Sequence, residues 1–497
     1  MPGRATLVAM LRESARRNPD HPAFIQGDGT TVTYRAFCRD VCATADALHD
    51  AGVQPGDRVG ILFGNCADYG VAYYAAFAVG AIAVGLDAAQ EAAALERNLA
   101  HCEPSVLLAP AGSARALALQ DKLPSLRRVM PVQRGGAALG DREIDEPRDP
   151  SAPAAIIYTS GTTGEPRGVT LSHRNLAANT RAIIQYLELS PADRTMSALP
   201  FFHTYGNSVL HSHLAAGATL LLAESLAYPH VVVKRMEAER ATGFAGVAAS
   251  YALLLRRVDL AAHDLSSLRY LTQAGSAISP TLVDRLLEAL PHARLFRMYG
   301  QTEATARITW LPPERLHDKP GSVGVPVAGV ELQVRDRSGR RLPAGKVGEV
   351  HVRGDSVMLG YWNAPEATAA VLKDGWLATG DLGRLDPEGF LTLEGRAKDQ
   401  IKSGAHRISP DEIEAVVTQM SGIVECAAIG VPDDILGEVV RLHVVIAAGQ
   451  DLTGRAIQAH CRQHLPVYMV PKQVVFSPAL PRTPSGKVQR FRLREYA

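Results

Sequence analysis

Short β-rich runs alternate with helical stretches over most of the chain, and this alternation restricts the folds that it can adopt. Three of the strand candidates, Arg58–Phe63, Ala154–Tyr158 and Thr219–Leu222, consist mostly of apolar residues. A helical pattern lies between later runs, as at Pro280–Leu290. Apolar strands that alternate with helices predict α/β layers in which most strands are buried.

The character of the sequence changes after about Pro320, where Gly-rich strand signals become dense. Runs such as KVGEVHVRG and GFLTLEGR are typical of an antiparallel β subdomain with tight turns. We place the main boundary at Gly395–Lys398, after which the pattern predicts a compact α+β unit. Its expected elements are a helix from Pro410, strands at Val424–Ile429 and Val439–Ile446, and a helix near Gly454–His464.

Composition favours a globular protein without a large electrostatic field. Apolar residues make up 46% of the chain, charged residues make up 21%, and the formal net charge is +1. Net charge therefore recruits neither nucleic acid nor anionic lipid. The longest uncharged apolar run, Val71–Leu86, falls short of the roughly 18–20 residues that span a bilayer. Because it is rich in Ala and Gly, we expect a buried helix followed by a buried strand and no transmembrane segment.

The cysteines and the first residues favour a cytoplasmic protein. The six cysteines form no C-x-x-C pair and show no zinc spacing, a pattern that suits a reducing compartment. We expect Cys38 and Cys42 to pack in the core. The N-terminal residues contain no signal-peptide apolar region of adequate length, and they predict an amphipathic helix that ends near Pro19.

The segment YTSGTTGEPRG, which directly follows a predicted strand, carries the groups that a polyphosphate needs. Glycines let the backbone turn and expose N–H groups, hydroxyls add donors, and Arg167 adds a positive charge. The glycines are Gly161, Gly164 and Gly168, and the hydroxyl residues are Thr159, Ser160, Thr162 and Thr163. A flexible surface turn is the alternative, but three glycines and four hydroxyls after a buried strand disfavour it.

The spacing of this segment differs from that of a Walker A loop, G-x-x-x-x-G-K-[ST]. Glu165, Pro166 and Arg167 follow Gly164, where that pattern requires Lys and a hydroxyl residue. A kinase or P-loop ATPase is therefore disfavoured.

The run YTSGTTGEPRGVTLSH resembles the phosphate-loop signature of the adenylate-forming superfamily, which includes acyl-CoA synthetases, peptide-synthetase adenylation domains and firefly luciferase. Arg167 stands where the family usually has Lys, and because both are cations we expect ATP binding to be retained. The resemblance extends from about Thr33 to Gln489, with the family's motifs in order.

This resemblance implies an α/β fold in two domains. The large N-terminal domain, residues 1–395, would contain two β–α layered subdomains plus a β subdomain. A small mobile α+β C-terminal domain, residues 396–497, would follow a hinge near Lys398.

Two further segments resemble the family's nucleotide-binding motifs. In QAGSAIS, Gly275, Ser276 and Ala277 are small enough for a planar base to approach the backbone, and the matching loop contacts adenine beside the acyl pocket. The motif YGQTE is more specific. The resemblance assigns all five residues of this motif to binding of the nucleotide or its metal: Tyr299, Gly300, Gln301, Thr302 and Glu303.

Within YGQTE the resemblance implies separate roles. Tyr299 would stack on adenine, and Gly300 would allow close approach of the nucleotide. Thr302 is similar to the residue that contacts the α-phosphate, and Glu303 would supply a hard carboxylate ligand for Mg²⁺.

Five residues in later or separate motifs complete the expected site. Asp381, in GWLATGDLG, and Arg396, in GRAKDQIKSG, resemble the two ribose contacts. Lys487, in LPRTPSGKVQR, matches the lysine that holds the carboxylate and the α-phosphate during adenylation. Lys402 matches a position implicated in the second half-reaction, and His203, in PFFHTYGN, resembles the gate of the acyl pocket.

The resemblance implies an acid–thiol ligase that uses ATP and Mg²⁺ to form an acyl-adenylate and then transfers the acyl group to a pantetheine thiol. CoA is the expected acceptor, and the phosphopantetheine of an acyl carrier protein is the alternative. A second alternative is a catalytically silent nucleotide-binding homologue. The joint presence of Thr302, Glu303, Asp381, Arg396 and Lys487 argues against it.

The absence of an acidic residue near His203 restricts the class of acid that the protein could activate. Relatives that activate α-amino acids place an Asp near His203 to bind the ammonium group, but no acidic residue occurs between Arg194 and Ala223. A buried ammonium without a carboxylate would be costly. We therefore expect a fatty, aromatic or other non-α-amino acid, whereas Tyr251 could line its pocket or simply pack in the core.

Overall fold

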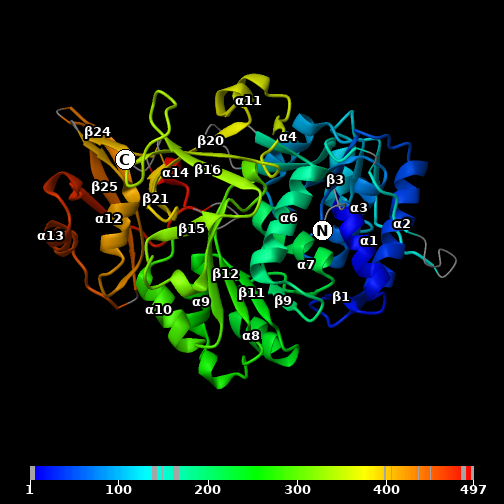
Figure 1. Cartoon of the computed structure of the whole chain (residues 1–497), viewed down its shortest axis with the longest axis horizontal. Coiled ribbons are helices and arrows are strands. Elements are labelled where there is room, and N and C mark those ends of the chain that lie inside the picture. Colours follow the sequence, from blue (N-terminus) through cyan, green and yellow to red (C-terminus); the bar gives the residue numbers. More distant parts are fainter. Residues whose placement is uncertain are drawn as a thin grey trace.

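A computed structural model describes residues 6–136, 143–147, 149–159, 167–396, 399–403, 406–434, 436–447, 449–482 and 488–493. Two large sheets and one small sheet organise these residues (Figure 1). The architecture confirms the expected α/β class, with a large N-terminal part and a small C-terminal unit. Among the described residues, no helix is long and apolar enough to cross a bilayer.

The first sheet has seven strands. In spatial order they are β18 (Gly360–Tyr361), β8 (Arg167–Ser172), β7 (Pro153–Thr159), β4 (Ile82–Gly85), β3 (Arg58–Ile61), β5 (Val106–Leu108) and β6 (Arg128–Met130). The strands from β7 to β6 run parallel, whereas β8 is antiparallel to both β7 and β18. The short strand β18 brings residues from far along the chain to the β7–β8 hairpin.

The longest apolar run divides as expected. Its first part belongs to α3 (Ala67–Ala78), in which all but two residues are buried, and its last part to the fully buried β4. A turn with Gly80 at φ +71° separates the two elements. A helix that is apolar on every side has to be enclosed, and α3 packs against α2 (Tyr34–Asp50), which carries the buried Cys42.

The second sheet has 14 strands and joins a parallel half to an antiparallel half. In spatial order they are β16 (Val330–Arg335), β17 (Gly348–Gly354), β20 (Trp376–Leu385), β21 (Leu391–Arg396), β15 (Ser322–Pro326), β14 (Thr309–Leu311), β13 (Arg294–Tyr299), β12 (Tyr270–Gln273), β11 (Gly243–Gly246), β9 (Arg194–Ser197), β10 (Thr219–Leu222), β1 (Pro22–Ile25) and β2 (Thr31–Thr33), with β19 (Leu372–Lys373) beside β20.

The antiparallel region after Pro320 is antiparallel as predicted, but it does not form a sheet of its own. Strand β15 pairs with β14 on one side and with β21 on the other. The antiparallel strands therefore extend the α/β sheet, and the ends of β13 and β21 belong to one continuous scaffold.

Two helices lie between the large sheets (Figure 1). Helix α6 (His173–Leu187) directly follows β8 and begins at a capping box made by Ser172 and Asn175. Helix α7 (Thr204–Ala216) is buried from Gly206 to Ala215 and ends at Gly217, which has φ +78°. Because α7 is enclosed on all sides, its polar side chains must find partners inside the protein or in a ligand.

The C-terminal unit is built on a five-stranded sheet. The strands are β23 (His406–Ile408), β22 (Ile401–Ser403), β25 (Gly437–Ile446), β24 (Ile423–Asp433) and β26 (Gln473–Phe476), with helices α12 (Pro410–Val417) and α13 (Gly454–His464). The expected strands lie within β24 and β25, and the expected last helix coincides with α13. Only the β25–β26 pair is parallel among these described strands.

Candidate active site

The β7–β8 hairpin closes the segment that we expect to bind phosphate. Its register pairs Thr159 with Arg167, and Thr159 Oγ1 donates a hydrogen bond to the Arg167 carbonyl oxygen at 3.5 Å. The expected loop residues between them lie outside the described residues: Ser160, Gly161, Thr162, Thr163 and Gly164. The described ends place the exposed Arg167 at the mouth of the hairpin.

Gly168 has a different role from the turn residue that the sequence indicated. It lies within β8, where a Cβ atom would come 2.7 Å from Ile156 Cγ2 and 3.3 Å from Trp362 Cβ. Glycine is therefore required there by close packing, and not by the conformation of the loop.

Arg167 belongs to a chain of contacts that ends on the expected metal ligand. Its guanidinium carbon lies 5.7 Å from the centroid of the Tyr361 ring, and the Tyr361 hydroxyl donates to Glu303 Oε1 at 2.9 Å. Burial and then the charge of Glu303 raise the pKa of Tyr361, so the phenol stays protonated and donates. Glu303 is thereby held by one oxygen, which leaves the other for a ligand.

Asp381 gathers the residues expected at the ribose. Its Oδ2 accepts from the Tyr299 hydroxyl at 2.5 Å, and its Oδ1 accepts from Arg396 Nε at 3.0 Å. The backbone N–H of Asp381 donates to Thr379 Oγ1 at 3.1 Å. Burial and then the charge of Asp381 raise the pKa of Tyr299 well above its usual range. A carboxylate oxygen can accept more than one hydrogen bond, so Asp381 keeps capacity for two ligand hydroxyls.

A tight turn joins these two groups. A Cβ atom at Gly300 would overlap the carbonyl oxygen of Ala306, so only glycine lets the turn fold back on itself. Thr302 is half-buried in a single 3₁₀ turn with Glu303. The next residues, Thr305 and Ala306, have φ of +54° and +83°, which is strained for side chains with a Cβ.

The expected adenine loop follows β12 and is exposed at Gly275, Ser276 and Ala277. Gly275 has φ +87°, and Gln273 Nε2 donates to the Ser276 carbonyl oxygen at 2.7 Å, which fixes the loop beside the strand end. Ile278, where the family often has Pro, is buried in the core. The small residues are therefore exposed to solvent, while Gln273 and the buried Ile278 hold the loop in place.

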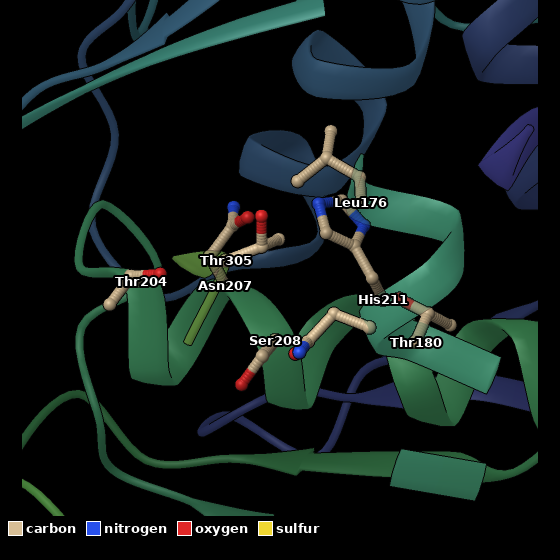
Figure 2. Close-up of a pocket in the computed structure, with 8 residues that line it drawn as sticks. Leu176, Thr180, Thr204, Asn207, Ser208, His211 and Thr305 are labelled. Carbon is tan, nitrogen blue, oxygen red and sulfur yellow. The ribbon is translucent and has the colours of Figure 1, made fainter. Parts of the chain in front are cut away.

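His203 caps the start of α7 and is half-buried. Its backbone N–H donates to the Pro200 carbonyl oxygen at 3.1 Å, and its ring centroid lies 4.7 Å from that of Phe202. Beyond it, a small cavity of about 10 Å³ lies between α6 and α7 (Figure 2). The lining residues are Leu176, Asn179, Thr180, Thr204, Asn207, Ser208, His211 and Thr305.

Most of the residues that line this cavity carry polar side chains. Figure 2 shows Asn207 and Thr305 close together, with the imidazole of His211 beside them. His211 Nδ1 lies 3.2 Å from the Tyr74 hydroxyl, and burial lowers the pKa of His211 to about 3, so the ring is neutral. His211 Nε2 and Asn179 Oδ1 are buried without a hydrogen-bond partner among the described residues.

Of the two lysines expected from the C-terminal unit, the structure describes one. Lys402 lies on β22 with its side chain exposed, and its backbone N–H donates to Glu438 Oε2 at 2.6 Å within the same unit. Lys487 and the hinge residue Lys398 lie outside the described residues.

The described groups fit a nucleotide with one divalent cation. Gln301 Nε2 is buried and has no partner among the described residues, so it can donate to a ligand. Within the described ranges, no three His, Cys, Asp or Glu side chains gather to hold a metal ion. A Mg²⁺ ion on Glu303 would therefore take its remaining ligands from phosphate and water, as this ion commonly does.

Sequence reasoning missed two residues of the site. Tyr361 stands far from both Arg167 and Glu303 in the sequence, and the β8–β18 pairing brings it to the strand that begins at Arg167. Arg307 lies four residues after the recognised motif. Its signal is that a charged residue is only 3% exposed, and burial is known only from the fold.

Comparison with known proteins agrees with this arrangement. A family model described as AMP-binding enzyme matches residues 11–362, and one described as AMP-binding enzyme C-terminal domain matches residues 412–487. A feruloyl-CoA synthase of an Amycolatopsis species is 35% identical over 482 residues, which cover 97% of this chain and 96% of that protein.

Solved structures agree along the whole length. ATP-bound MatB from Rhodopseudomonas palustris superposes with a TM-score of 0.90 and 30% identity, covering 99% of this chain and 98% of that one. The amide bond synthetase McbA from Marinactinospora thermotolerans gives a TM-score of 0.88 and 31% identity, covering 99% of both chains. The protein thus belongs to the AMP-binding enzyme family, the adenylate-forming enzymes that its motifs resemble.

Proposed function

We propose that this protein is an AMP-forming acid–CoA ligase. The carboxylate of the substrate attacks the α-phosphorus of ATP, pyrophosphate leaves, and the acyl group is joined to AMP as a mixed anhydride. The CoA thiol then attacks the acyl carbon, so that a thioester forms and AMP is released. Similarity over nearly the full length to a feruloyl-CoA synthase supports this pair of reactions.

One observation carries the proposal: a nine-residue segment, 299–307, touches both charged groups of the site. At its start Tyr299 contacts Asp381, and in its middle Glu303 is held beside Arg167 through Tyr361. A nucleotide whose ribose lies at Asp381 would extend its phosphates toward the metal ligand and the cation. This is the order of groups that in-line attack on the α-phosphorus requires.

The residue roles follow from this orientation. Asp381 and Arg396 would hold the ribose, and Thr302 the α-phosphate. Glu303 would hold a Mg²⁺ ion, which would neutralise charge on the phosphate oxygens. The remaining nucleotide contacts are assigned to the hairpin loop with its cation (Thr159, Ser160, Gly161, Thr162, Thr163, Gly164 and Arg167) and to the adenine side (Gly275, Ser276, Ala277, Tyr299, Gly300 and Gln301).

The C-terminal unit would serve both steps in turn. We divide the chain into residues 1–395 and 396–497, with a hinge near Lys398. Lys487 would neutralise charge during adenylation, and Lys402 would reach the site during thioester formation after the unit has rotated. His203 would stand at the entrance to the acid pocket.

The test is ATP-dependent pyrophosphate release with a panel of fatty, aromatic and short polar acids, followed by mass spectrometry of the acyl product. We expect release with at least one acid and a CoA thioester when CoA is added. Transfer only to a carrier protein would replace CoA by its phosphopantetheine, and transfer only to an amine would replace the thiol. Absence of pyrophosphate release with every acid would overturn the proposal and favour a silent homologue.

A separate check concerns the two half-reactions. Lys487→Ala should abolish pyrophosphate release but spare thioester formation from a supplied acyl-adenylate. Equal loss of both steps would contradict the assignment of Lys487 to the first step alone.

A further inference from the structure

Arg307 is a buried cation whose counter-charge is missing from the described protein. It lies four residues beyond Glu303, and it is 3% exposed. It forms no ion pair with a described residue, and its Nε has no hydrogen-bond partner there. Because removal of a charge from water is expensive, buried guanidinium groups are normally paired with an acid. The site therefore contains a fixed positive charge that a ligand can neutralise.

The groups around the guanidinium hold it without neutralising it. Its central carbon lies 4.2 Å from the centroid of the Tyr205 ring, and Tyr186 also interacts with it. Burial raises the pKa of Tyr205 to about 12, so this ring stays uncharged. A face-on aromatic ring attracts the cation but accepts no hydrogen bond from the guanidinium edge, where Nε has no partner among the described residues.

Tyr205 is itself fixed to the strands beneath it. Its hydroxyl lies 2.9 Å from both the carbonyl oxygen and Oγ1 of Thr272, at β12, and it donates to the Gly246 carbonyl oxygen at 3.4 Å, at the end of β11. Tyr205 follows the gate residue His203 by two positions on the same chain segment. The stacked pair thus lies on the acid side of the site, where the segment that begins at His203 enters the core.

The backbone that delivers Arg307 is strained and closely packed. Thr305 and Ala306 adopt positive φ, and Asn179 Nδ2 donates to the Arg307 carbonyl oxygen at 2.8 Å. Strain of this kind persists only where the surroundings impose it, and it concentrates at functional sites. One short turn therefore sets the spacing between the expected metal ligand, Glu303, and the buried cation.

Most residues that line the neighbouring cavity are polar, whereas a fatty chain would need apolar neighbours. Asn179 and Thr305 connect it to the Arg307 turn, and only Leu176 among its lining residues is aliphatic. A hydrocarbon placed there would leave buried donors and acceptors, such as His211 Nε2, without partners. The surroundings of Arg307 favour a compact acid with a second polar group.

We propose that the substrate is a dicarboxylic acid, and that Arg307 pairs with the carboxylate that is not activated. This inference rests on the proposed ligase function and adds the class of acid. The second carboxylate supplies the missing counter-charge, and its two oxygens match the fork of N–H donors on the guanidinium. The same acid with an amide in place of that carboxylate lacks the charge but keeps the size.

The experiment compares linear dicarboxylic acids of three to six carbons and phthalate with their monoamides, using hexanoate and ferulate as monocarboxylic controls. The readout is kcat/KM for pyrophosphate release with saturating ATP and Mg²⁺. The variants are Arg307→Gln, which removes the charge, and Arg307→Lys, which keeps it. Arg294→Gln is the matched control, because Arg294 also lies over an aromatic ring, 5.3 Å from the Phe296 centroid, but is 42% exposed.

We expect the best dicarboxylic acid to exceed its monoamide roughly hundredfold in the unsubstituted protein, because a buried charge pair is lost. Arg307→Gln should remove this preference, whereas Arg307→Lys should keep most of it and Arg294→Gln all of it. If Arg307→Gln fails to fold, the inference is tested by the ratio of kcat/KM for diacid and monoamide in the unsubstituted protein and in Arg307→Lys.

Three outcomes would overturn the inference while the ligase function stands. They are faster release with monoamides than with any diacid, faster release with hexanoate or ferulate, and equal loss for diacid and monoamide in Arg307→Gln. The last outcome would mean that Arg307 orients the reacting carboxylate or supports the fold. No release with any acid would instead overturn the ligase function, and the inference with it.

Discussion

Two arginines of the candidate site lie over tyrosine rings, and they differ in burial. Arg167 is exposed and lies 5.7 Å from the Tyr361 centroid, whereas Arg307 is 3% exposed and lies 4.2 Å from the Tyr205 centroid. An exposed arginine is solvated and can adjust to a ligand as it enters. A buried one is fixed, and it favours only a ligand that brings the opposite charge.

The difference extends to the surroundings of each arginine. On the nucleotide side, charges are already balanced, because Asp381 pairs with Arg396 and the carboxylate of Glu303 accepts from Tyr361 near Arg167. On the acid side, Arg307 lacks an acidic partner in the described chain. A region whose charges are balanced suits a ligand that is the same in every turnover. A region with an unpaired positive charge suits selection among acids, because it favours the acid that brings a negative charge.

The largest effect should come from Glu303→Gln, which removes the expected metal ligand and should lower kcat/KM roughly a thousandfold for every acid alike. Steady-state pyrophosphate release at several Mg²⁺ concentrations measures it. Tyr361→Phe is the control, because it removes only the hydrogen bond to Glu303 and should cost less than about tenfold. If the loss of kcat/KM in Glu303→Gln varied strongly between acids, it would contradict the assignment of Glu303 to the nucleotide side alone.

Arg167→Ala should lower the rate about a hundredfold for all acids, because one phosphate-neutralising cation is lost. Arg167→Lys should retain activity within about tenfold, since an exposed cation needs no fixed fork geometry. The same assay with two chemically different acids tests both variants. An acid-dependent response would assign Arg167 to the acid side and contradict the comparison.

Asp381→Asn should raise the KM for ATP about 10- to 30-fold, because the charge-assisted hydrogen bonds to the ribose hydroxyls weaken. Varying ATP at saturating acid gives the value, and thermal unfolding without ATP shows how far loss of the Arg396 partner destabilises the fold. A change confined to the KM for the acid would contradict placement of the ribose at Asp381.

The smallest effect concerns stability and pH on the acid side. Burial lowers the pKa of His211 from about 6.5 to about 3 in the folded protein. As the pH falls below 6.5 the unfolded chain binds a proton that the folded chain does not, so stability is full above 6.5 and declines toward pH 3. At pH 5.5 the loss from His211 alone amounts to about 1.4 kcal/mol.

Urea unfolding at pH 7.5 and 5.5 checks this contribution. His211→Gln should reduce the difference in unfolding free energy between the two pH values by about 1.4 kcal/mol. Substitution of the exposed His230 by Gln should leave the difference unchanged. An unchanged difference in His211→Gln would show that the imidazole is not held neutral by burial.

The motifs along the sequence predicted a nucleotide site, and three of the residues assigned to it, Tyr299, Asp381 and Arg396, are in contact in the structure. Small residues at turns and strand ends keep a local signature. Contacts between strands that are far apart in the sequence have no such local signature. Tyr361 was missed for this reason, because its position depends on the pairing of β18 with β8.

Burial was the second property that the sequence did not reveal. Arg307 follows the recognised motif closely, yet an arginine in a linear sequence is indistinguishable from a solvated one. Similarly, the strand signals after Pro320 predicted antiparallel pairing but not that β15 would join them to the α/β sheet. Both features depend on long-range packing, which periodicity does not encode.

Arg396 is the last residue of β21, and beyond it the chain leaves for the C-terminal unit. The bond from Arg396 to Asp381 is therefore also the last anchor before that connection. Rotation of the unit, as proposed above, would act on β21 both through this connection and through α12, which packs against that strand. A spectroscopic label beside Arg396 would then respond both to binding of a ribose at Asp381 and to the orientation of the C-terminal unit.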